Sequence, residues 1–401
     1  MKTKVWKLSS LALIMIFAFS VVSVVHAAVP QLPIPPTISV GRPTGFLAYD
    51  SAKGEIFVTT GVNNTVLVIS DSTNAVVATI PVGKDPLGVA YDSSKGEIFV
   101  ANSNSNTVSI ISDSTNTVVA TVNVGTEPEE GIVYDSAKGE IFVANSNAHT
   151  AISGSIGTVS VISDGTNAVV ATINVGAGPW GVAYDSEKGE VFVSNEIAST
   201  ISVISDSTNV VVATVTGKIS GPEGLAYDPA KGEIFVADYP TGAFSVISDK
   251  NNAVVTTVTI PDEHSGNPNS LAYDSVKGEL FLTCEASAAV QVISDSNNAV
   301  VACALLAELP TNIYPEGVAC DFGKGEIFVA DGISELSILS DSSAQSASTS
   351  STSSSSATST ISASATPTVP EFINAAPVFV VAAMSVITLY AVTLKVKKLR
   401  K

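Results

Sequence analysis

Side chains that could do chemistry recur in one loop motif of this chain. The motif is Pro-x-Gly or a close variant, and its variable position holds, in chain order, Thr44, Leu87, Glu130, Trp180, Glu223, Asn269 and Glu316. Ca²⁺ takes carboxylate and amide oxygens in flexible number. If the loops face one axis, four of these residues predict a calcium site: Glu130, Glu223, Asn269 and Glu316. The alternative is that a glutamate before glycine is only a solvated residue.

Aromatic and histidine residues in the variable loops predict a binding face. Trp180, Tyr239 and Tyr314 lie among polar residues, where a ring can stack on a sugar or anchor a protein partner. For Trp180 the alternative is packing beside a long insertion at residues 146–157. Beyond the N-terminal segment the histidines are His149 and His264. A metal-dependent lyase or lactonase-like enzyme would use such groups, but the chain has no nucleophile motif or Gly-rich phosphate loop, and we expect no enzyme.

Repeats of one sequence unit must position these loops. Tyr-Asp-x-x-Lys-Gly-Glu starts at Tyr49, Tyr91, Tyr134, Tyr184, Tyr227 and Tyr273, and a seventh variant starts at Cys320. The spacing, roughly 42 to 50 residues, is typical of four-stranded propeller blades. In the second repeat, alternating β-branched and aromatic residues predict strands at 88–91, 97–101, 107–111 and 118–124.

The acids that recur in every repeat are predicted to form turns. Gly96 can take the positive φ of a tight hairpin, and Asp92 can accept hydrogen bonds from the amides that follow it. Asp113 and Asn116 suit a second turn for the same reasons. A catalytic residue is needed once per site, whereas these residues occur once per repeat, so we interpret them as structural.

The two ends of the repeat region predict how the ring closes. The seventh repeat, 318–339, has three strands and then runs into a serine-rich segment. The missing fourth strand is predicted at 37–41, because TISVG matches the ends of VATVNVG and VATINVG. Closure removes exposed sheet edges. The fold class is therefore predicted to be all-β: one seven-bladed β-propeller at 37–341, closed by an N-terminal strand.

The repeats also resemble a known family. Phe99-Val100-Ala101-Asn102 and Phe192-Val193-Ser194-Asn195 resemble the signature of the YVTN family of β-propeller repeats, with phenylalanine in place of tyrosine. NTVSVIS-type and TNAVVATI-type phrases are similar to that family's consensus, over about three quarters of the chain. The resemblance implies a WD40-like propeller of a secreted or surface-layer protein, and few members have an assigned activity.

The segments that flank the repeats predict export and anchoring. Residues 1–28 have the form of a signal peptide, and a Pro-rich lead-in follows at 29–36. Residues 342–370 predict a Ser/Thr-rich stalk. Residues 371–401 combine an apolar span with the basic tail KVKKLRK, which predicts one transmembrane helix with its tail in the cytoplasm. Pro370-Glu371-Phe372 resembles the PEF-type sorting signal of archaeal surface proteins, which implies exchange of the helix for a lipid.

Charge, cysteines and one sequon complete the expectations. The formal net charge of −18 excludes nucleic acid as a partner. Cys284, Cys303 and Cys320 are odd in number and predict buried thiols rather than a disulfide framework. Asn63 begins the one Asn-x-Thr acceptor for glycosylation.

The sequence thus favours a non-catalytic propeller at the extracellular face of the membrane, with no cofactor except the Ca²⁺ considered above. Its predicted partner is a protein, a glycan or a neighbouring copy. The alternatives are the metal-dependent enzyme and a purely structural, self-associating coat subunit.

Overall fold

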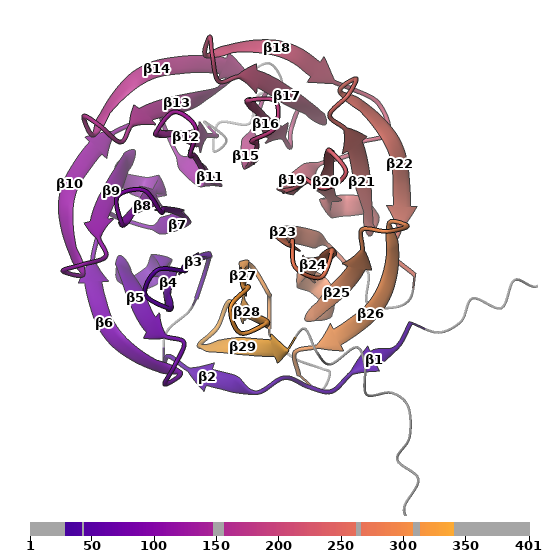
Figure 1. Ribbon diagram of the computed structural model, residues 1–401, viewed down its shortest axis with the longest axis horizontal. Helices are drawn as coiled ribbons and strands as arrows, with labels where there is room; N and C mark the ends of the chain where they lie inside the picture. Colours follow the sequence, from indigo (N-terminus) through magenta and orange to yellow (C-terminus); the bar gives the residue numbers. More distant parts are fainter. Residues whose placement is uncertain (1–28, 42–43, 147–155, 262–265, 308–312, 341–401) are drawn as a thin grey trace, which may run out of the picture. The chain divides into compact units, whose positions relative to one another are not determined.

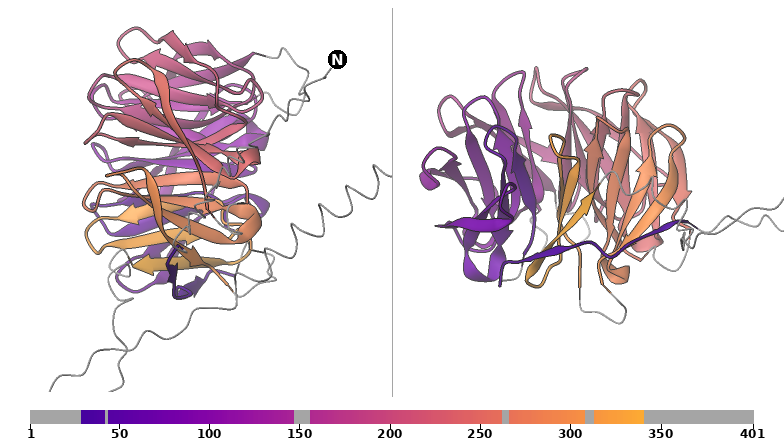
Figure 2. Two further views of the ribbon diagram at one scale, coloured as in Figure 1. Left: turned by 90° about the vertical axis from the view of Figure 1, so that its right-hand side faces the viewer. Right: turned by 60° about the horizontal axis from the view of Figure 1, so that its bottom comes forward.

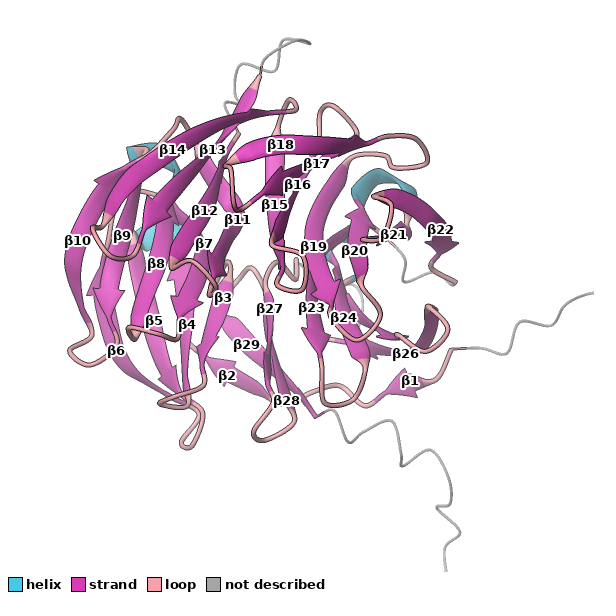
Figure 3. Cartoon of the chain, turned by 45° about the horizontal axis from the view of Figure 1, so that its top comes forward, coloured by secondary structure: helices cyan, strands magenta, loops and turns pink. Residues whose placement is uncertain are grey.

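The structure is a computed structural model that describes residues 29–41, 44–146, 156–261, 266–307 and 313–340. Seven sheets are arranged as blades around a common centre, as Figure 1 shows. In blades one to five the first strand lies innermost and the fourth outermost (Figure 1). Strands make up most of the described chain, and the few helical segments are single turns (Figure 3). The all-β, seven-bladed propeller predicted from the repeats is confirmed.

The strands of the first four blades follow the repeats closely. Blade one contains β3 (Leu47–Asp50), β4 (Glu55–Thr60), β5 (Thr65–Ser70) and β6 (Ala75–Pro81). Blade two contains β7 (Pro86–Asp92), β8 (Glu97–Asn102), β9 (Thr107–Ser112) and β10 (Thr117–Asn123). Blade three contains β11 (Pro128–Asp135), β12 (Glu140–Asn145), β13 (Gly157–Ser163) and β14 (Ala168–Val175). Blade four contains β15 (Pro179–Asp185), β16 (Glu190–Asn195), β17 (Thr200–Ser205) and β18 (Val210–Val215).

The remaining three blades keep this order with two additions. Blade five contains β19 (Pro222–Asp228), β20 (Glu233–Asp238), β21 (Ala243–Ser248) and β22 (Ala253–Thr259). Blade six contains β23 (Pro268–Asp274), β24 (Glu279–Cys284), β25 (Ala289–Ser294) and β26 (Ala299–Leu305), and it gains β1 (Gln31–Leu32). Blade seven contains β27 (Val318–Asp321), β28 (Glu326–Ala330), β29 (Glu335–Ser340) and β2 (Thr37–Ser39). Single 3-10 turns follow the second strands of blades one, two, five and six: Gly61–Asn63, Ser103–Ser105, Tyr239–Thr241 and Glu285–Ser287.

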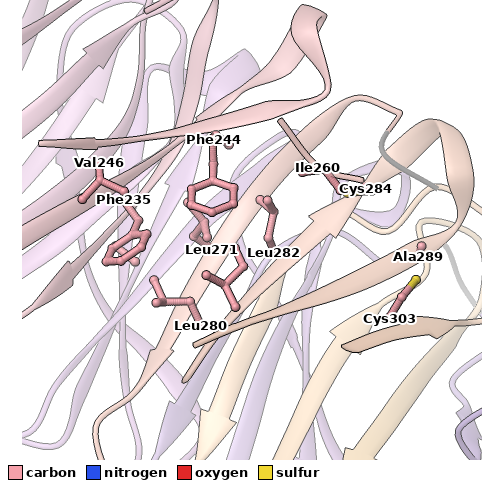
Figure 4. Packing of buried hydrophobic residues seen from close by; sticks show 13 residues of the cluster. Phe235, Phe244, Val246, Ile260, Leu271, Leu280, Leu282, Cys284, Ala289 and Cys303 are labelled. Atoms are coloured by element: carbon pink, nitrogen blue, oxygen red, sulfur yellow. The ribbon is translucent and has the colours of Figure 1, made fainter. Parts of the chain in front are cut away.

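Strand alternation builds the core between blades, because successive side chains point to opposite faces of a sheet. In β8, Ile98 and Val100 pack against blade one, whereas Phe99 packs against blade three. The same division repeats around the ring. Between blades five and six, Phe235 and Phe244 meet Leu280 and Leu282 (Figure 4). Burial of these apolar faces, at about 25 cal/mol per Å², is what holds the blades together.

The predicted closing strand lies at the outer edge of blade seven. β2 pairs antiparallel with β29, and Ile38 lies opposite Leu336 (Figures 1 and 2). Ile38 is buried in the cluster that joins blade seven to blade one. The lead-in was not predicted to pair, but β1 adds a short parallel strand to β26, with Leu32 opposite Ala304. The predicted buried thiols are also found, because Cys284, Cys303 and Cys320 are all buried.

The recurring acids form turns, as interpreted from their repetition, and the structure shows that they also join blades through the recurring lysines. Asp92 Oδ1 accepts hydrogen bonds from the amides of Ser94, at 2.8 Å, and Lys95, at 3.3 Å. The Lys95 ammonium donates a hydrogen bond to the main-chain oxygen of Asp164 in the next blade. The Asp164 carboxylate lies 3.4 Å from the same ammonium nitrogen. Equivalent pairs join Lys53 to Asp113, Lys138 to Asp206, Lys188 to Asp249 and, closing the ring, Lys324 to Asp71.

The tyrosine of each motif contributes another contact between blades. Burial and the neighbouring Asp50 carboxylate of blade one raise the pKa of Tyr91 in blade two. Burial and Asp321 of blade seven act in the same way on the pKa of Tyr49 in blade one. Each lysine pair is partly exposed and contributes about 0–1 kcal/mol, so these contacts orient the blades more than they stabilise them.

Removal of the closing side chain tests the role of β2. We expect Ile38→Ala to lower the free energy of unfolding by about 2–4 kcal/mol, because Ile38 is only 8% exposed and fills the junction between the last and first blades. Thr37→Ala, at the exposed neighbour on the same strand, should change it by about 0.5 kcal/mol or less. Urea denaturation of the full chain measures both. Equal effects of the two substitutions would contradict closure by β2.

Two glycines of blade three form a matched test of the turn geometry. Gly139 has φ of 66°, and a Cβ there would lie 2.6 Å from an Asp164 carboxylate oxygen. Gly165 meets nothing closer than the Ser163 hydroxyl at 3.5 Å. We expect Gly139→Ala to destabilise the fold by about 1–3 kcal/mol, whereas Gly165→Ala should be neutral or stabilise it by up to about 1 kcal/mol. Thermal unfolding of the two variants checks the difference, and equal melting temperatures would refute the turn assignment.

Candidate functional site

The variable loops meet at one end of the channel. A cavity of about 300 Å³ is lined by Phe46, Leu87, Glu129, Glu130, Trp180, Glu223, Tyr239, Asn269, Glu285 and Glu316. These residues come both from the segments that enter the first strands and from the turns that follow the second strands. Their shared cavity places the two sets of loops on one face of the ring. Phe46 and Glu130 also line a second cavity of about 150 Å³, deeper among the first strands.

Glycine brings the loops close to the axis. A Cβ at Gly88 would collide with the Glu130 carbonyl of the next blade, and one at Gly181 would collide with the Glu223 carbonyl. The innermost strands therefore pack backbone against backbone, which only glycine permits. Ser194 also links the two blades by hydrogen bonds. Its hydroxyl accepts one from the Gly181 amide at 2.7 Å and donates one to the Glu223 carbonyl at 2.6 Å. Similar hydroxyl bonds hold the carbonyls of Leu87 and Glu316.

Glu130 and Trp180 form a direct pair at the cavity. The Trp180 indole nitrogen donates a hydrogen bond of 2.7 Å to Glu130 Oε2. Burial in the narrow channel raises the pKa of Glu130 to about 8, although the hydrogen bonds from Trp180 and Ser270 act in the opposite direction. Ser270 belongs to blade six, so the Glu130 side chain reaches across the channel from blade three. The ring of Trp180 is accordingly fixed against this carboxyl group.

Two buried acceptors at the cavity lack hydrogen-bond partners. Glu223 is 5% exposed and Asn269 is 7% exposed, yet neither Glu223 Oε2 nor Asn269 Oδ1 meets a donor. A buried polar atom left unsatisfied costs about 1–3 kcal/mol. Burial, followed by repulsion from Glu130, raises the pKa of Glu223 to about 9. Each acceptor therefore lacks the partner that a buried polar atom normally has.

Glu316 completes a set of three carboxyl groups that hold protons more tightly than usual. Burial and repulsion from Glu285 raise its pKa to about 7. Burial also raises the pKa of Tyr239 in the same cavity, with Glu285 contributing. Carboxyl groups with strongly raised pKa values in a cleft are typical of functional sites, although structural clusters also produce them.

The structure brings together most of the residues predicted at the channel mouth. Leu87, Glu130, Trp180, Glu223, Asn269 and Glu316 all line the cavity, as does Tyr239. Thr44 does not, because its hydroxyl turns to Asp331 at 3.2 Å and Phe46 takes its place. Tyr314 is 48% exposed and is not among the cavity-lining residues. His149, His264 and most of the insertion beside which Trp180 might have packed lie outside the described residues.

Three lining residues were not anticipated from the sequence. Phe46, Glu129 and Glu285 lie outside the variable position of the Pro-x-Gly motif. An extra residue in blade three, Pro-Glu-Glu-Gly, is a signal that could have identified Glu129. Asn63 is exposed in the turn after β4, and its glycosylation stays a prediction.

The calcium site remains a prediction. Within the described ranges, no three His, Cys, Asp or Glu side chains gather in an arrangement that could hold a metal ion. The four predicted ligands nevertheless share a cavity, to which they bring three carboxyl groups and the amide oxygen of Asn269. Likewise, among the described residues no helix is long and apolar enough to span a membrane, and the apolar segment at 375–394 lies outside them.

The raised pKa of Glu223 predicts how stability depends on pH. Between its ordinary value, near 4.5, and about 9, the folded chain binds a proton that the unfolded chain has released, so stability falls as pH rises. We expect Glu223→Gln to reduce that fall by up to about 1.4 kcal/mol per pH unit. Urea denaturation at pH 5, 6.5 and 8 measures the slope. Glu187→Gln, in an exposed turn, should keep the slope of the unmodified chain, and an unchanged slope in Glu223→Gln would contradict the assignment.

Comparison with known proteins supports the fold. No protein-family model and no curated protein matches this sequence, so the resemblance to YVTN repeats remains a prediction. Among solved structures, the chain is similar to one described as "Kuenenia stuttgartiensis Hydrazine Synthase", with a TM-score of 0.63 and 17% sequence identity. The similarity covers 79% of this chain and 98% of that one. At this identity it establishes a shared β-propeller fold and carries no activity across.

Proposed function

We propose that this chain is a non-catalytic binding propeller, displayed at the outer surface of the cell, which takes part of its ligand into the cavity at the channel mouth. One observation carries the proposal. Residues that repeat in every blade are used in turns and contacts between blades, whereas residues that differ between blades converge on one cavity. Propeller folds host many functions, so the argument rests on this site rather than on the fold.

Sequence features outside the described residues support the proposed location. The N-terminal segment has the form of a signal peptide, and the Ser/Thr-rich segment is typical of a stalk. The apolar C-terminal segment with its basic tail would retain the protein at the membrane, either as a helix or through a lipid. The ligand would then be a surface protein, a glycan or a neighbouring copy.

The size of the cavity limits what can enter. A volume of about 300 Å³ is many times the space that one water molecule needs, but it suits a side chain or one sugar ring rather than a folded surface. A macromolecular partner would therefore insert a single group, while the surrounding loops contact the rest. Buried anchors of this kind supply much of the affinity in known interfaces.

A cavity-blocking variant tests this proposal without assuming the chemistry of the ligand. We expect the full chain in detergent to bind defined members of peptide or glycan arrays, and Leu87→Trp to weaken that binding at least tenfold because it fills the cavity. Val62→Trp is the matched control, since Val62 is 78% exposed in the turn after β4 and does not line the cavity. Binding that survives Leu87→Trp, or is equally lost in Val62→Trp, would overturn the channel mouth as the binding site.

A further inference from the structure

The wall of the channel-mouth cavity consists of hydrogen-bond acceptors and aromatic rings. Of the ten described residues that line it, five are glutamates, one is asparagine and three are aromatic, and none is lysine or arginine. The indole N–H of Trp180 is engaged by Glu130, so it is not available to a ligand. A ligand with several hydrogen-bond donors fits this wall, because ionised carboxylates and the Asn269 amide oxygen are acceptors.

The unsatisfied acceptors indicate where such a donor would sit. Glu223 Oε2 and Asn269 Oδ1 are both buried and without partners, and they come from the adjacent blades five and six. Asn269 is uncharged, so this observation does not follow from the acidity of the cluster. One donor with several N–H bonds can satisfy both atoms, and an ammonium group has three.

The charges around the cavity favour a cation. Glu223 faces Glu130, Glu196 and Glu285. The other two carboxyl groups are surrounded in the same way: Glu130 faces Glu129 and Glu316, and Glu316 faces Glu285, Asp331 and Asp85. Trp180, Tyr239 and Phe46 add aromatic rings, whose faces attract organic cations.

We propose that the channel-mouth cavity binds an organic ammonium group, such as the end of a lysine side chain. This inference rests on the proposed function and specifies its ligand class. The ammonium would donate to Glu223 and Asn269 and lie beside the ring of Trp180. A lysine on a surface partner would thus be the group that enters the channel.

Two other ligand classes fit the wall less well. Ca²⁺ takes six to eight oxygens at 2.3–2.6 Å, whereas the described carboxylates do not gather closely enough to form a metal site. A sugar would use the protonated carboxyl groups as donors, so its binding would weaken as pH rises. An ammonium ion needs ionised carboxylates, so its binding releases protons and tightens by about tenfold per pH unit for each proton released.

Calorimetry on the full chain separates these classes. The probes are Nα-acetyl-lysine methylamide, its uncharged analogue Nα-acetyl-norleucine methylamide, N-acetylglucosamine and Ca²⁺, each at pH 6 and pH 8. We expect the lysine probe to bind at least tenfold more tightly than the norleucine probe, and at least tenfold more tightly at pH 8 than at pH 6. Glu223→Gln should weaken it at least tenfold, and Glu187→Gln should leave it unchanged.

Different results would overturn the inference in distinguishable ways. If the sugar, Ca²⁺ or the norleucine probe binds, is blocked by Leu87→Trp, and the lysine probe does not bind, the ammonium class is wrong and the cavity remains the binding site. If the lysine probe binds equally well at both pH values, or binds the Glu223→Gln variant as tightly as the unmodified chain, these carboxylates are not the groups that bind the ammonium. If lysine binding also survives Leu87→Trp, the inference and the proposed function both fail.

Discussion

The close approach of the innermost strands determines both the ring and its candidate site. Gly88, Gly131, Gly181 and Gly224 each lie against a carbonyl of the next blade, where a methyl group would collide with it. This contact narrows the channel, and the residue before each of these glycines lines the cavity at its mouth. Side chains that are far apart in the sequence, such as Glu130 and Glu316, come to share one small cavity because of it. A wider ring would leave the same glutamates separately solvated.

The two faces of the propeller use their acids for opposite purposes. On the face of the hairpin turns, Asp92 and its equivalents each accept amide hydrogen bonds through one carboxylate oxygen. The acids of the second turn, such as Asp164, pair with lysines of adjacent blades. At the channel mouth, Glu223 is buried and Glu130 is half-buried beside other acids, and their pKa values rise. Such an arrangement costs stability, since the charged forms are disfavoured by burial and by one another. Burial also raises the pKa of Glu97 in the repeats, but the variable loops bring several such carboxyl groups into one cavity.

Much of the fold could be predicted from the sequence because its causes are local and repeated. The alternation of side chains around Phe99 predicts which face of the strand packs against which neighbouring blade. The seventh repeat has only three strands of its own, so it needs a fourth from elsewhere in the chain, and β2 with Ile38 supplies it. The short β1 had no such signal, because two residues between prolines show no periodicity. Within the candidate site, the motif located Glu130, Glu223 and Glu316, but their retained protons depend on burial and mutual distance. Likewise, the hydrogen bond from Trp180 to Glu130 joins neighbouring blades, and the sequence of either repeat alone does not predict it.

A crystal structure of the full chain with its tightest ammonium probe would test the central claim most directly. The account predicts the ligand nitrogen in the channel-mouth cavity, within about 2.7–3.2 Å of Glu223 Oε2 and Asn269 Oδ1. The ring of Trp180 should lie within about 6 Å of the same nitrogen. A ligand found instead along the outer strands, or on the face of the hairpin turns, would contradict the claim that the variable loops form the binding site.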